Sequence, residues 1–135
     1  MEISTDPERL DVELIHHWLS TDAYWALGRS RETVERSIEH SLNIGAYDGP
    51  DQVGYARVVT DQATFAWLCD VYVDPGRRGS GIGAALLDAV AAELAPMRLR
   101  RVMLATADAH DVYTRYGFRP LPDPERFMVS LAADG

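Results

Sequence analysis

Glycines alternate with other residues between Gly79 and Gly83, where an apolar run passes into an Ala- and Leu-rich helical pattern, VDPGRRGSGIGAALLDAVAAEL over residues 73–94. Glycines leave consecutive backbone N–H groups free to face a concavity, because no side chain blocks the approach of a ligand. The positive N-terminal end of the following helix and the charges of Arg77 and Arg78 would attract an anion there. This combination predicts a loop that holds a pyrophosphate, with a glycine turn that serves only close packing as the alternative.

Two other phosphate-binding motifs compete for the same stretch. The letters GSGIGA satisfy the loose dinucleotide pattern G-x-G-x-x-G/A. However, an antiparallel meander comes before them, and only about 50 residues follow, too few for the two halves of a dinucleotide-binding fold. A mononucleotide P-loop needs Lys and Ser or Thr after its glycines, and Ala84 follows Gly83 here. Both alternatives fail on context.

Hydrophobic periodicity divides the chain into the elements that would carry this loop. The expected helices cover residues 7–20, 30–40, 82–94 and 108–117. The expected strands are three from residue 43 onward, joined at DGPD and TDQA and ending with Thr64–Val73, then one over 98–106 and a last one over 126–132. Tyr24 and Trp25 fall between the first two helices, in a loop where large aromatic residues either fill the core or line a pocket.

Charge and composition narrow the class of ligand. The chain has 135 residues, 47% of them apolar and 25% charged, as in an ordinary folded domain. Its net charge of -8 and pI near 4.8 argue against nucleic acid as a partner and make a cationic small molecule or peptide easier to recruit. All 13 basic residues are arginine, which we attribute to the codon usage of a GC-rich bacterium.

The sequence also predicts where the protein resides. The start MEISTDPERL has neither a basic nor an apolar segment of a signal peptide, and no apolar run approaches the roughly 20 residues of a membrane span. A single cysteine, Cys69, excludes an internal disulfide framework and a multi-cysteine zinc site. We therefore expect a cytoplasmic protein without a membrane partner.

Two signatures in the chain resemble those of the GNAT superfamily of N-acetyltransferases. The first is a strand followed by Arg or Gln, two variable residues, Gly, one variable residue and Gly or Ala, as in VYVDPGRRGSGIGAALLDAV. The second is a tyrosine four residues before a Gly-Phe pair, here Tyr113 ahead of Gly117 and Phe118. The resemblance covers residues 64–118 closely and implies a GNAT-like α/β (α+β) fold with a mixed, mostly antiparallel central sheet flanked by helices.

The resemblance implies acetyl-CoA as the cosubstrate and assigns residues to it. The backbone of the central strand would pair with pantetheine as an added strand does, and the glycine loop would hold the pyrophosphate. The residues assigned to the cofactor are Val71, Tyr72, Val73, Arg77, Arg78, Gly79, Ser80, Gly81, Ile82, Gly83 and Ala84.

Direct attack of an amine on a thioester requires a deprotonated amine, a donor to the oxyanion and a proton for the departing thiolate. Tyr113 matches the general acid of the family, with core or CoA packing as the alternative. Asp70 lies within an apolar strand, where an unpaired carboxylate is costly; it would position or deprotonate the amine, or else pair with an arginine. His110, three residues before Tyr113 and near Asp108, would join a proton relay, or else cap or pack.

The sequence departs from the family pattern at two positions. The family's glutamate commonly falls where this chain has Cys69, and its asparagine where the chain has Thr106. The identity of the base is therefore open, and a water relay is one alternative. A covalent role for Cys69 competes with that of a small buried hydrophobe.

The acceptor site would be formed by aromatic residues, namely Tyr24, Trp25, Phe65 and Trp67. Such a lining suits an arylalkyl amine or a cation, although these side chains could equally belong to the core. His16, His17 and His40 lack the spacing of metal ligands, so we predict no metal.

Together these observations predict a single GNAT-like domain over residues 1–135 that transfers an acetyl group from acetyl-CoA to a primary amine of a small molecule. Transfer to a protein N-terminus or lysine is the alternative within the fold. A non-catalytic acyl-CoA-binding regulatory module is the alternative from another class. Homodimers are common in the family, but no residue argues for one here.

Overall fold

The structure is a computed structural model that describes residues 1–132. The described part of the chain consists of two compact units, which divide between Ala105 and Thr106, and each is described by itself. The single domain over residues 1–135 stays a prediction. No helix in the described part of the chain is long and apolar enough to cross a membrane.

A five-stranded sheet forms the centre of the first unit, in the order β1-β2-β3-β4-β5. Its strands are β1 (Glu2–Ser4), β2 (Leu42–Asp48), β3 (Asp51–Thr60), β4 (Phe65–Val73) and β5 (Arg101–Met103). Neighbours from β1 to β4 are antiparallel, whereas β4 and β5 are parallel. The predicted mixed, mostly antiparallel sheet flanked by helices is confirmed. Only β1 was not predicted, because three residues are too few to leave a pattern.

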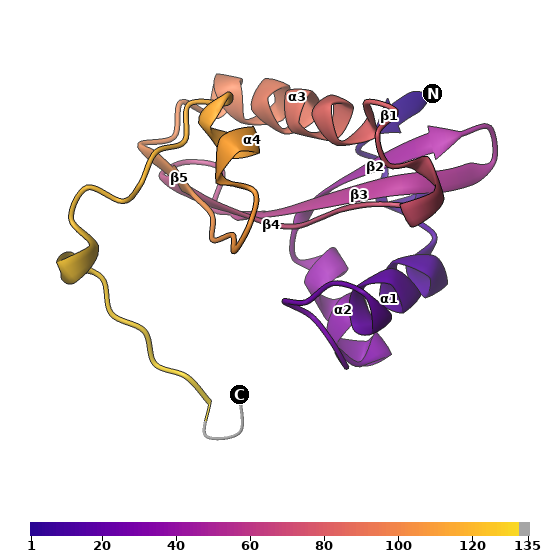
Figure 1. The fold of residues 1–135 in the computed structure, drawn as a ribbon, viewed down its shortest axis with the longest axis horizontal. Helices are drawn as coiled ribbons and strands as arrows, with labels where there is room; N and C mark the ends of the chain where they lie inside the picture. The colour runs from indigo at the N-terminus through magenta and orange to yellow at the C-terminus, as the bar shows by residue number, and fades with distance from the viewer. Residues whose placement is uncertain (133–135) are drawn as a thin grey trace. The chain divides into compact units, whose positions relative to one another are not determined.

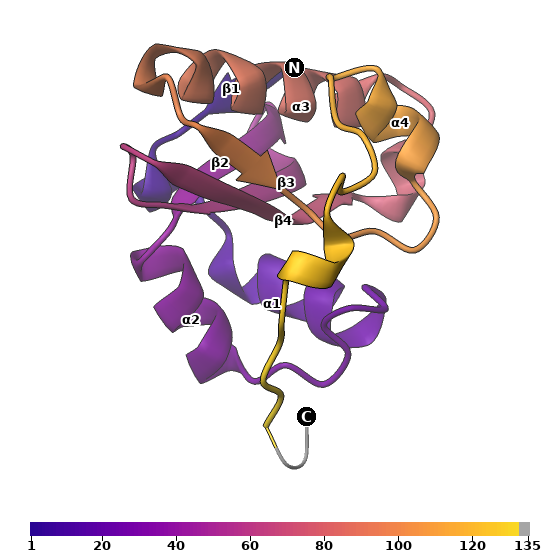
Figure 2. The same ribbon diagram turned by 90° about the vertical axis from the view of Figure 1, so that its left-hand side faces the viewer.

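Helices cover both faces of this sheet (Figures 1 and 2). The helix α3 (Ile82–Leu94) lies along one face, and α1 (Val12–Thr21) and α2 (Arg31–Glu39) lie on the other. On the α1 side, Trp18 packs against Tyr72 with ring centroids 5.3 Å apart. The core on that side consists of buried residues from both helices, their loop and the sheet, namely Ile15, Trp18, Leu19, Ala23, Ala26, Val34, Tyr55 and Tyr72.

The first helix begins later than its sequence predicts. Pro7 starts a short 3-10 helix, Pro7–Arg9, whose N-cap is Asp6. The α-helix begins only after Asp11, whose carboxylate accepts the backbone N–H of Leu14 at 3.0 Å. The N–H of Asp11 donates to Gln52 Oε1 at 2.7 Å, so a strand residue sets where α1 starts. The predicted start at Pro7 is wrong. Asp6 and Asp11 can each cap a helix, and the hydrogen bond from Asp11 to Gln52 selects Asp11 as the cap of α1.

The predicted last strand over residues 126–132 is also wrong. The second unit contains α4 (His110–Thr114) and a 3-10 turn, Pro124–Arg126, and residues 127–132 have no regular secondary structure. An alternating apolar pattern provides only the propensity for a strand, whereas a strand exists through hydrogen bonds to a neighbour. Within residues 1–132, no strand pairs with this segment.

Gly54 fixes the distance between β3 and α3. A Cβ at this position would lie 2.9 Å from Cγ2 of Ile82 and 3.0 Å from Cδ1 of Leu86. We expect Gly54→Val to lower the free energy of unfolding by about 1–3 kcal/mol in urea denaturation, because α3 must move away from the sheet. Gly83→Ala is the control, since its Cβ would meet Val73 at an ordinary 3.8 Å. A Gly54→Val protein as stable as the parent would contradict this packing.

Candidate active site

The glycine loop leads from β4 into α3 and is shaped by left-handed backbone. A 3-10 turn, Pro75–Arg77, follows β4, and Asp74 accepts the N–H of Gly76 at 3.2 Å. Gly79 and Gly81 then have φ of 84° and 89°, a region that favours glycine. A Cβ at either position would meet no atom within 4 Å, so the glycines are there for their conformation and not for lack of space.

The N-terminus of α3 lies at the end of this loop. Gly81 is its N-cap residue and provides no side-chain hydrogen bond to the first amides of the helix. An anion can therefore approach these amides and the positive end of the helix dipole. Gly79, Ser80 and Gly81 are exposed, and the hydroxyl of Ser80 donates to the carbonyl of Arg77 and closes the loop. The predicted cradle thus has the backbone geometry that it requires.

The two arginines of the loop are engaged with carboxylates. Arg77 pairs with Asp48 at the β2–β3 turn. Arg78 donates to the carbonyl of Val73 at 3.1 Å and to Asp22 Oδ2 at 3.1 Å, and Asp22 also accepts the hydroxyl of Tyr72 at 2.6 Å. The Arg78 guanidinium lies 5.2 Å from the centre of the Tyr72 ring. These contacts fasten the glycine loop to the residue that follows α1.

One edge of β4 is open next to the glycine loop. β4 pairs with β5 only through Phe65, Ala66 and Trp67, opposite residues 101–103. From Leu68 to Val73, β4 has no strand partner on that side among residues 1–132. Unpaired backbone N–H and C=O groups on a strand edge are a template for an extended ligand. The open edge includes Val71, Tyr72 and Val73, the residues predicted to pair with pantetheine.

A β-bulge interrupts β4 within this open stretch. Tyr55 pairs with Tyr72 and Arg57 with Cys69, so two residues of β4 lie opposite one residue of β3. Asp70 is one of the two, and its φ of 52° is unusual for a residue other than glycine. Because of the extra residue, Cys69 and Tyr72 lie on the same face of the sheet as Arg57 and Tyr55. This is the face that α1 and α2 cover.

Asp70 is buried, with 3% of its surface exposed, and three side chains hydrogen-bond to its carboxylate. Arg57 Nε donates to Oδ2 at 2.7 Å, and an Arg29 terminal nitrogen donates to the same oxygen at 2.9 Å. The indole N–H of Trp25 donates to Oδ1 at 2.7 Å. The partners come from β3 and from the loop between α1 and α2, so one carboxylate joins the sheet to that loop.

These partners decide the protonation of Asp70. Burial alone would raise the pKa of its carboxyl, but the charge and hydrogen bond of Arg57, with Arg29 and Trp25, outweigh burial and lower it. A carboxylate held in this way is a weak proton acceptor. The geometry therefore favours the arginine-pairing alternative over the role of a base, which stays a prediction.

Cys69 lies next to this cluster on β4 and is half-buried. Burial raises the pKa of its thiol, and the nearby Arg57 only partly opposes this. A neutral thiol is a poor nucleophile, so the environment favours packing over a covalent role.

The aromatic residues predicted to form the acceptor site lie in the first unit. Tyr24 is 51% exposed and Trp25 41%, and their rings meet edge to face with centroids 5.0 Å apart. Trp67 is half-buried on β4 and pairs with Val59, two residues from Arg57, so it lies on the same face as Arg57. Asp70, Arg29 and Arg57 are together called the Asp70 cluster. Phe65 is 38% exposed, two residues before Trp67. The hydrogen bond from Trp25 to Asp70 places one of these rings beside the bulge.

The second unit carries the two other predicted catalytic residues on α4. His110 is the first residue of this helix and is exposed, and Tyr113 follows one turn later on the same side. The Tyr113 ring packs edge to face against Phe118, with centroids 5.9 Å apart. Thr106 accepts the N–H of Ala109 at 3.1 Å and so caps the turn before α4. The roles of His110 and Tyr113 stay predictions.

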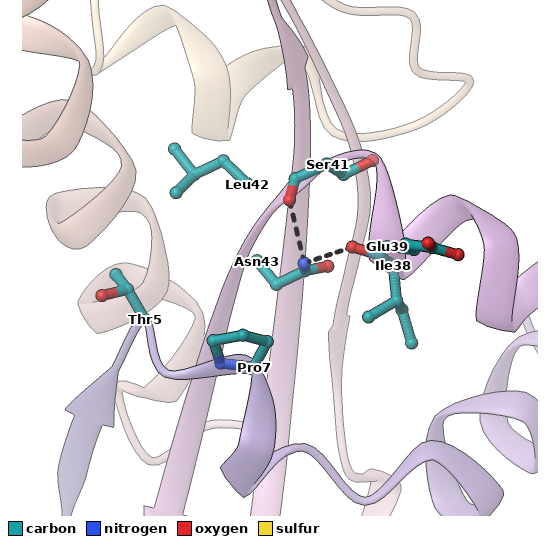
Figure 3. A pocket seen from close by; sticks show the side chains of 7 residues that line it. All are labelled: Thr5, Pro7, Ile38, Glu39, Ser41, Leu42 and Asn43. Atoms are coloured by element: carbon teal, nitrogen blue, oxygen red, sulfur yellow. Dashed lines mark hydrogen bonds between the residues drawn. The ribbon is translucent and has the colours of Figure 1, made fainter.

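A separate pocket of about 360 Å³ lies where the end of α2 meets β2 and the residues after β1 (Figure 3). It is lined by Thr5, Pro7, Ile38, Glu39, Ser41, Leu42 and Asn43. The Asn43 amide donates to the carbonyls of Ile38 and Ser41 at 2.8 and 3.1 Å, and its oxygen accepts the hydroxyl of Tyr55. The pocket contains none of the predicted site residues, and the polar groups of Asn43 are already paired.

Comparisons with known proteins bear on this arrangement. The model of the acetyltransferase (GNAT) family matches residues 12–118. The chain belongs to the GNAT family. The protein FG08082 of Gibberella zeae, which carries an acetyltransferase name, is 34% identical over 126 residues, 78% of this chain and 71% of its own length. The resemblance inferred from the two signatures is thereby confirmed.

Solved structures agree with this assignment. The crystal structure of a GNAT-family protein from Xanthomonas campestris pv. campestris is 46% identical and has a TM-score of 0.94, covering 97% of this chain and 92% of that one. An aminoglycoside 6'-N-acetyltransferase in complex with coenzyme A has a TM-score of 0.68 at 22% identity, over 78% of this chain and 62% of its own. At that identity the likeness concerns the fold alone.

Sequence reasoning did not identify Arg29 and Arg57 in this GNAT chain. Neither residue belongs to a motif, and they lie 41 and 13 residues from Asp70 along the chain. The only signal was Asp70 itself, because a carboxylate within an apolar strand requires a cationic partner. Which of the 13 arginines pair with Asp70 depends on strand register and on the path of the α1–α2 loop.

We expect Asp70→Asn to lower the free energy of unfolding by about 3 kcal/mol or more at pH 7, because a neutral amide then faces two largely buried guanidinium groups. The folded pKa of Asp70 lies below the unfolded value of about 4, so its contribution is complete above that value and is lost as pH falls through the folded pKa. Urea denaturation of the parent and variant should differ at pH 7, and the difference should begin to shrink below about pH 4 and vanish only below the folded pKa of Asp70.

Glu93→Gln, which removes an exposed carboxylate from α3, is the control and should leave stability nearly unchanged. Equal stability of the Asp70→Asn and parent proteins at pH 7 would mean that the carboxylate is not held by the two arginines.

Proposed function

We propose that this GNAT chain transfers an acetyl group from acetyl-CoA to the primary amine of a small molecule, within a ternary complex. The observation that carries the proposal is the open edge of β4, which leads directly into two exposed, left-handed glycines at the start of α3. An extended thioester arm and a pyrophosphate need these two features in this order.

The residues present fit the cosubstrate. Backbone groups of Val71, Tyr72 and Val73 would pair with the pantetheine arm, and the loop from Gly79 to Ala84 would bind the pyrophosphate through its amides. Space above the glycines supports this fit, because no atom lies within 4 Å of a Cβ placed at Gly79 or Gly81. Arg77 and Arg78 would contribute mainly through their backbone amides, since both side chains pair with carboxylates that offset their charge.

Bound acetyl-CoA supplies an activated acetyl group, whose carbon forms a bond to the amine nitrogen as its bond to sulfur breaks. The chain must bring a neutral amine to the bulge of β4 and protonate the leaving sulfur. In this proposal Asp70 is a positioning residue, because its ionised carboxylate holds Trp25 and Arg29. Water is the proposed acceptor of the amine proton. Cys69 stands where the family commonly has a glutamate, which supports this assignment.

Tyr113 is the proposed general acid. A phenol has a pKa near that of a thiol and can donate its proton to a thiolate. His110 lies one turn before Tyr113 on α4 and would relay a proton to it. The match of Tyr113 to the second family signature supports this assignment.

The exposed rings of Tyr24 and Trp25, with Phe65 and Trp67, form the proposed acceptor site. Rings exposed to solvent on a surface next to an open strand edge suit a small apolar or aromatic amine. A bacterial, cytoplasmic setting belongs to the same proposal, and it rests on composition.

Gly79→Ala/Gly81→Ala is expected to weaken CoA binding by about tenfold or more in calorimetric titration, because alanine disfavours the positive φ on which the amides depend. Gly49→Ala is the matched control, since Gly49 has a φ of 58° in the β2–β3 turn and its Cβ would also meet open space. The Gly49→Ala protein should have the same kind of backbone strain as the double variant but bind CoA as tightly as the parent protein. Equal losses in both proteins would remove the glycine loop as the binding site.

Tyr113→Phe is expected to lower kcat for acetylation by about tenfold to a hundredfold or more while the Kd of CoA changes little, because only the proton donor is lost. Thiol release across a panel of amines, followed at several pH values, measures the first quantity, and calorimetry the second. Turnover equal to that of the parent would exclude Tyr113 as the acid. CoA binding without thiol release from any amine would support the regulatory-module alternative.

A further inference from the structure

The Asp70 cluster contains more positive than negative charge. Arg29 and Arg57 each carry one positive charge, and they share a single carboxylate. The other titratable groups close to Arg57 are the thiol of Cys69 and the phenol of Tyr55, and burial raises the pKa of both and keeps them neutral. Among residues 1–132, neither guanidinium group forms an ion pair with a second carboxylate, so the cluster has an excess of one positive charge, which is costly in a partly buried site.

The part of the cluster that reaches solvent is cationic. The Asp70 side chain is 1% exposed, whereas that of Arg29 is 20% exposed and that of Arg57 13%. Arg29 uses one of its five N–H donors on Asp70, and Arg57 uses one on Asp70 and one on Ser41. Donors therefore remain on both guanidinium groups, and a planar fork of such donors matches a carboxylate.

The excess charge lies where the proposed reaction takes place. Asp70 is the bulged residue on the open edge of β4, and Trp25 is bound to it through the indole N–H. Trp67 and Arg57 lie on the same face of the sheet. A ligand that approaches the bulge from the open edge of β4 would thus meet an indole and guanidinium groups that bind the same carboxylate.

We infer that the acceptor amine carries a carboxylate, as an amino acid does, and that Arg29 and Arg57 bind this carboxylate while Trp25 contacts the apolar part. This inference rests on the proposed function and names the substrate class. It reverses the expectation from the net charge of -8, which favours a cation. A local, partly buried charge outweighs distant surface charges, because solvent and salt screen the latter.

The test uses pairs of acceptors that differ only in the carboxylate: phenylalanine with phenethylamine, and tryptophan with tryptamine. We expect the parent protein to prefer the amino acid of each pair by about tenfold to a hundredfold in kcat/KM, as one charge-assisted contact allows. Arg29→Met, which keeps the length and removes the charge, should reduce this ratio by about tenfold or more. Arg31→Met is the control, because Arg31 pairs with Glu35 on the exposed side of α2. This variant should preserve the ratio.

Calorimetric titration of each pair into the protein saturated with CoA separates this inference from the proposed function. Tighter binding of the amino acids that Arg29→Met abolishes, without thiol release from any amine, would support the carboxylate site and overturn the transferase. Turnover with equal or better use of phenethylamine and tryptamine would overturn the carboxylate site alone. Failure of both amino acids to bind the CoA-loaded protein would overturn it as well.

Discussion

The ion cluster at the β4 bulge, formed by Asp70, Arg29 and Arg57, holds the sheet and the α1–α2 loop together. Two residues of β4 face one residue of β3 there, and Asp70 adopts a left-handed conformation that directs its carboxylate inward. A buried carboxylate is tolerated only with partners, so Arg57 on β3 and Arg29 with Trp25 in the α1–α2 loop must converge on it. The conformation of that loop, and with it the proposed acceptor site, depends on one side chain of the sheet.

The same bulge lies within the open stretch of β4. Phe65 to Trp67 pair with β5, and from Leu68 to Val73 the edge has no strand partner on that side among residues 1–132. A bulge bends its strand and strengthens the local twist, and bulges are frequent next to functional sites. The open edge is continuous with the glycine loop, whose shape depends on positive φ angles at Gly79 and Gly81 and on the hydrogen bond from Ser80 to the carbonyl of Arg77. In the proposed function, the cosubstrate and the acceptor would therefore meet at this bulge.

The net charge of this GNAT protein and the local charge at the β4 bulge have opposite signs. The chain as a whole is acidic, and this net charge affects how charged ligands approach it within the screening length of the salt. The cluster of Arg29, Arg57 and Asp70 is locally cationic and partly shielded from solvent. Arg78 and Asp22 form a second link, between the glycine loop and the start of the α1–α2 loop. In the proposed function, selectivity for an acceptor depends on these local groups and not on the total charge.

The sequence by itself determined the family, the sheet flanked by helices and the glycine loop, because these depend on the two signatures, on local periodicity and on glycines at alternating positions. It also indicated Asp70 as a residue that needed a partner. Only the tertiary structure decided that Asp11 and not Asp6 caps α1, that residues 126–132 lack a strand partner, and that Arg29 and Arg57 hold Asp70. Each of these features depends on contacts between residues that are distant in the chain. Strand register, a bulge and the path of a loop bring those residues together, and no local sequence pattern encodes such contacts.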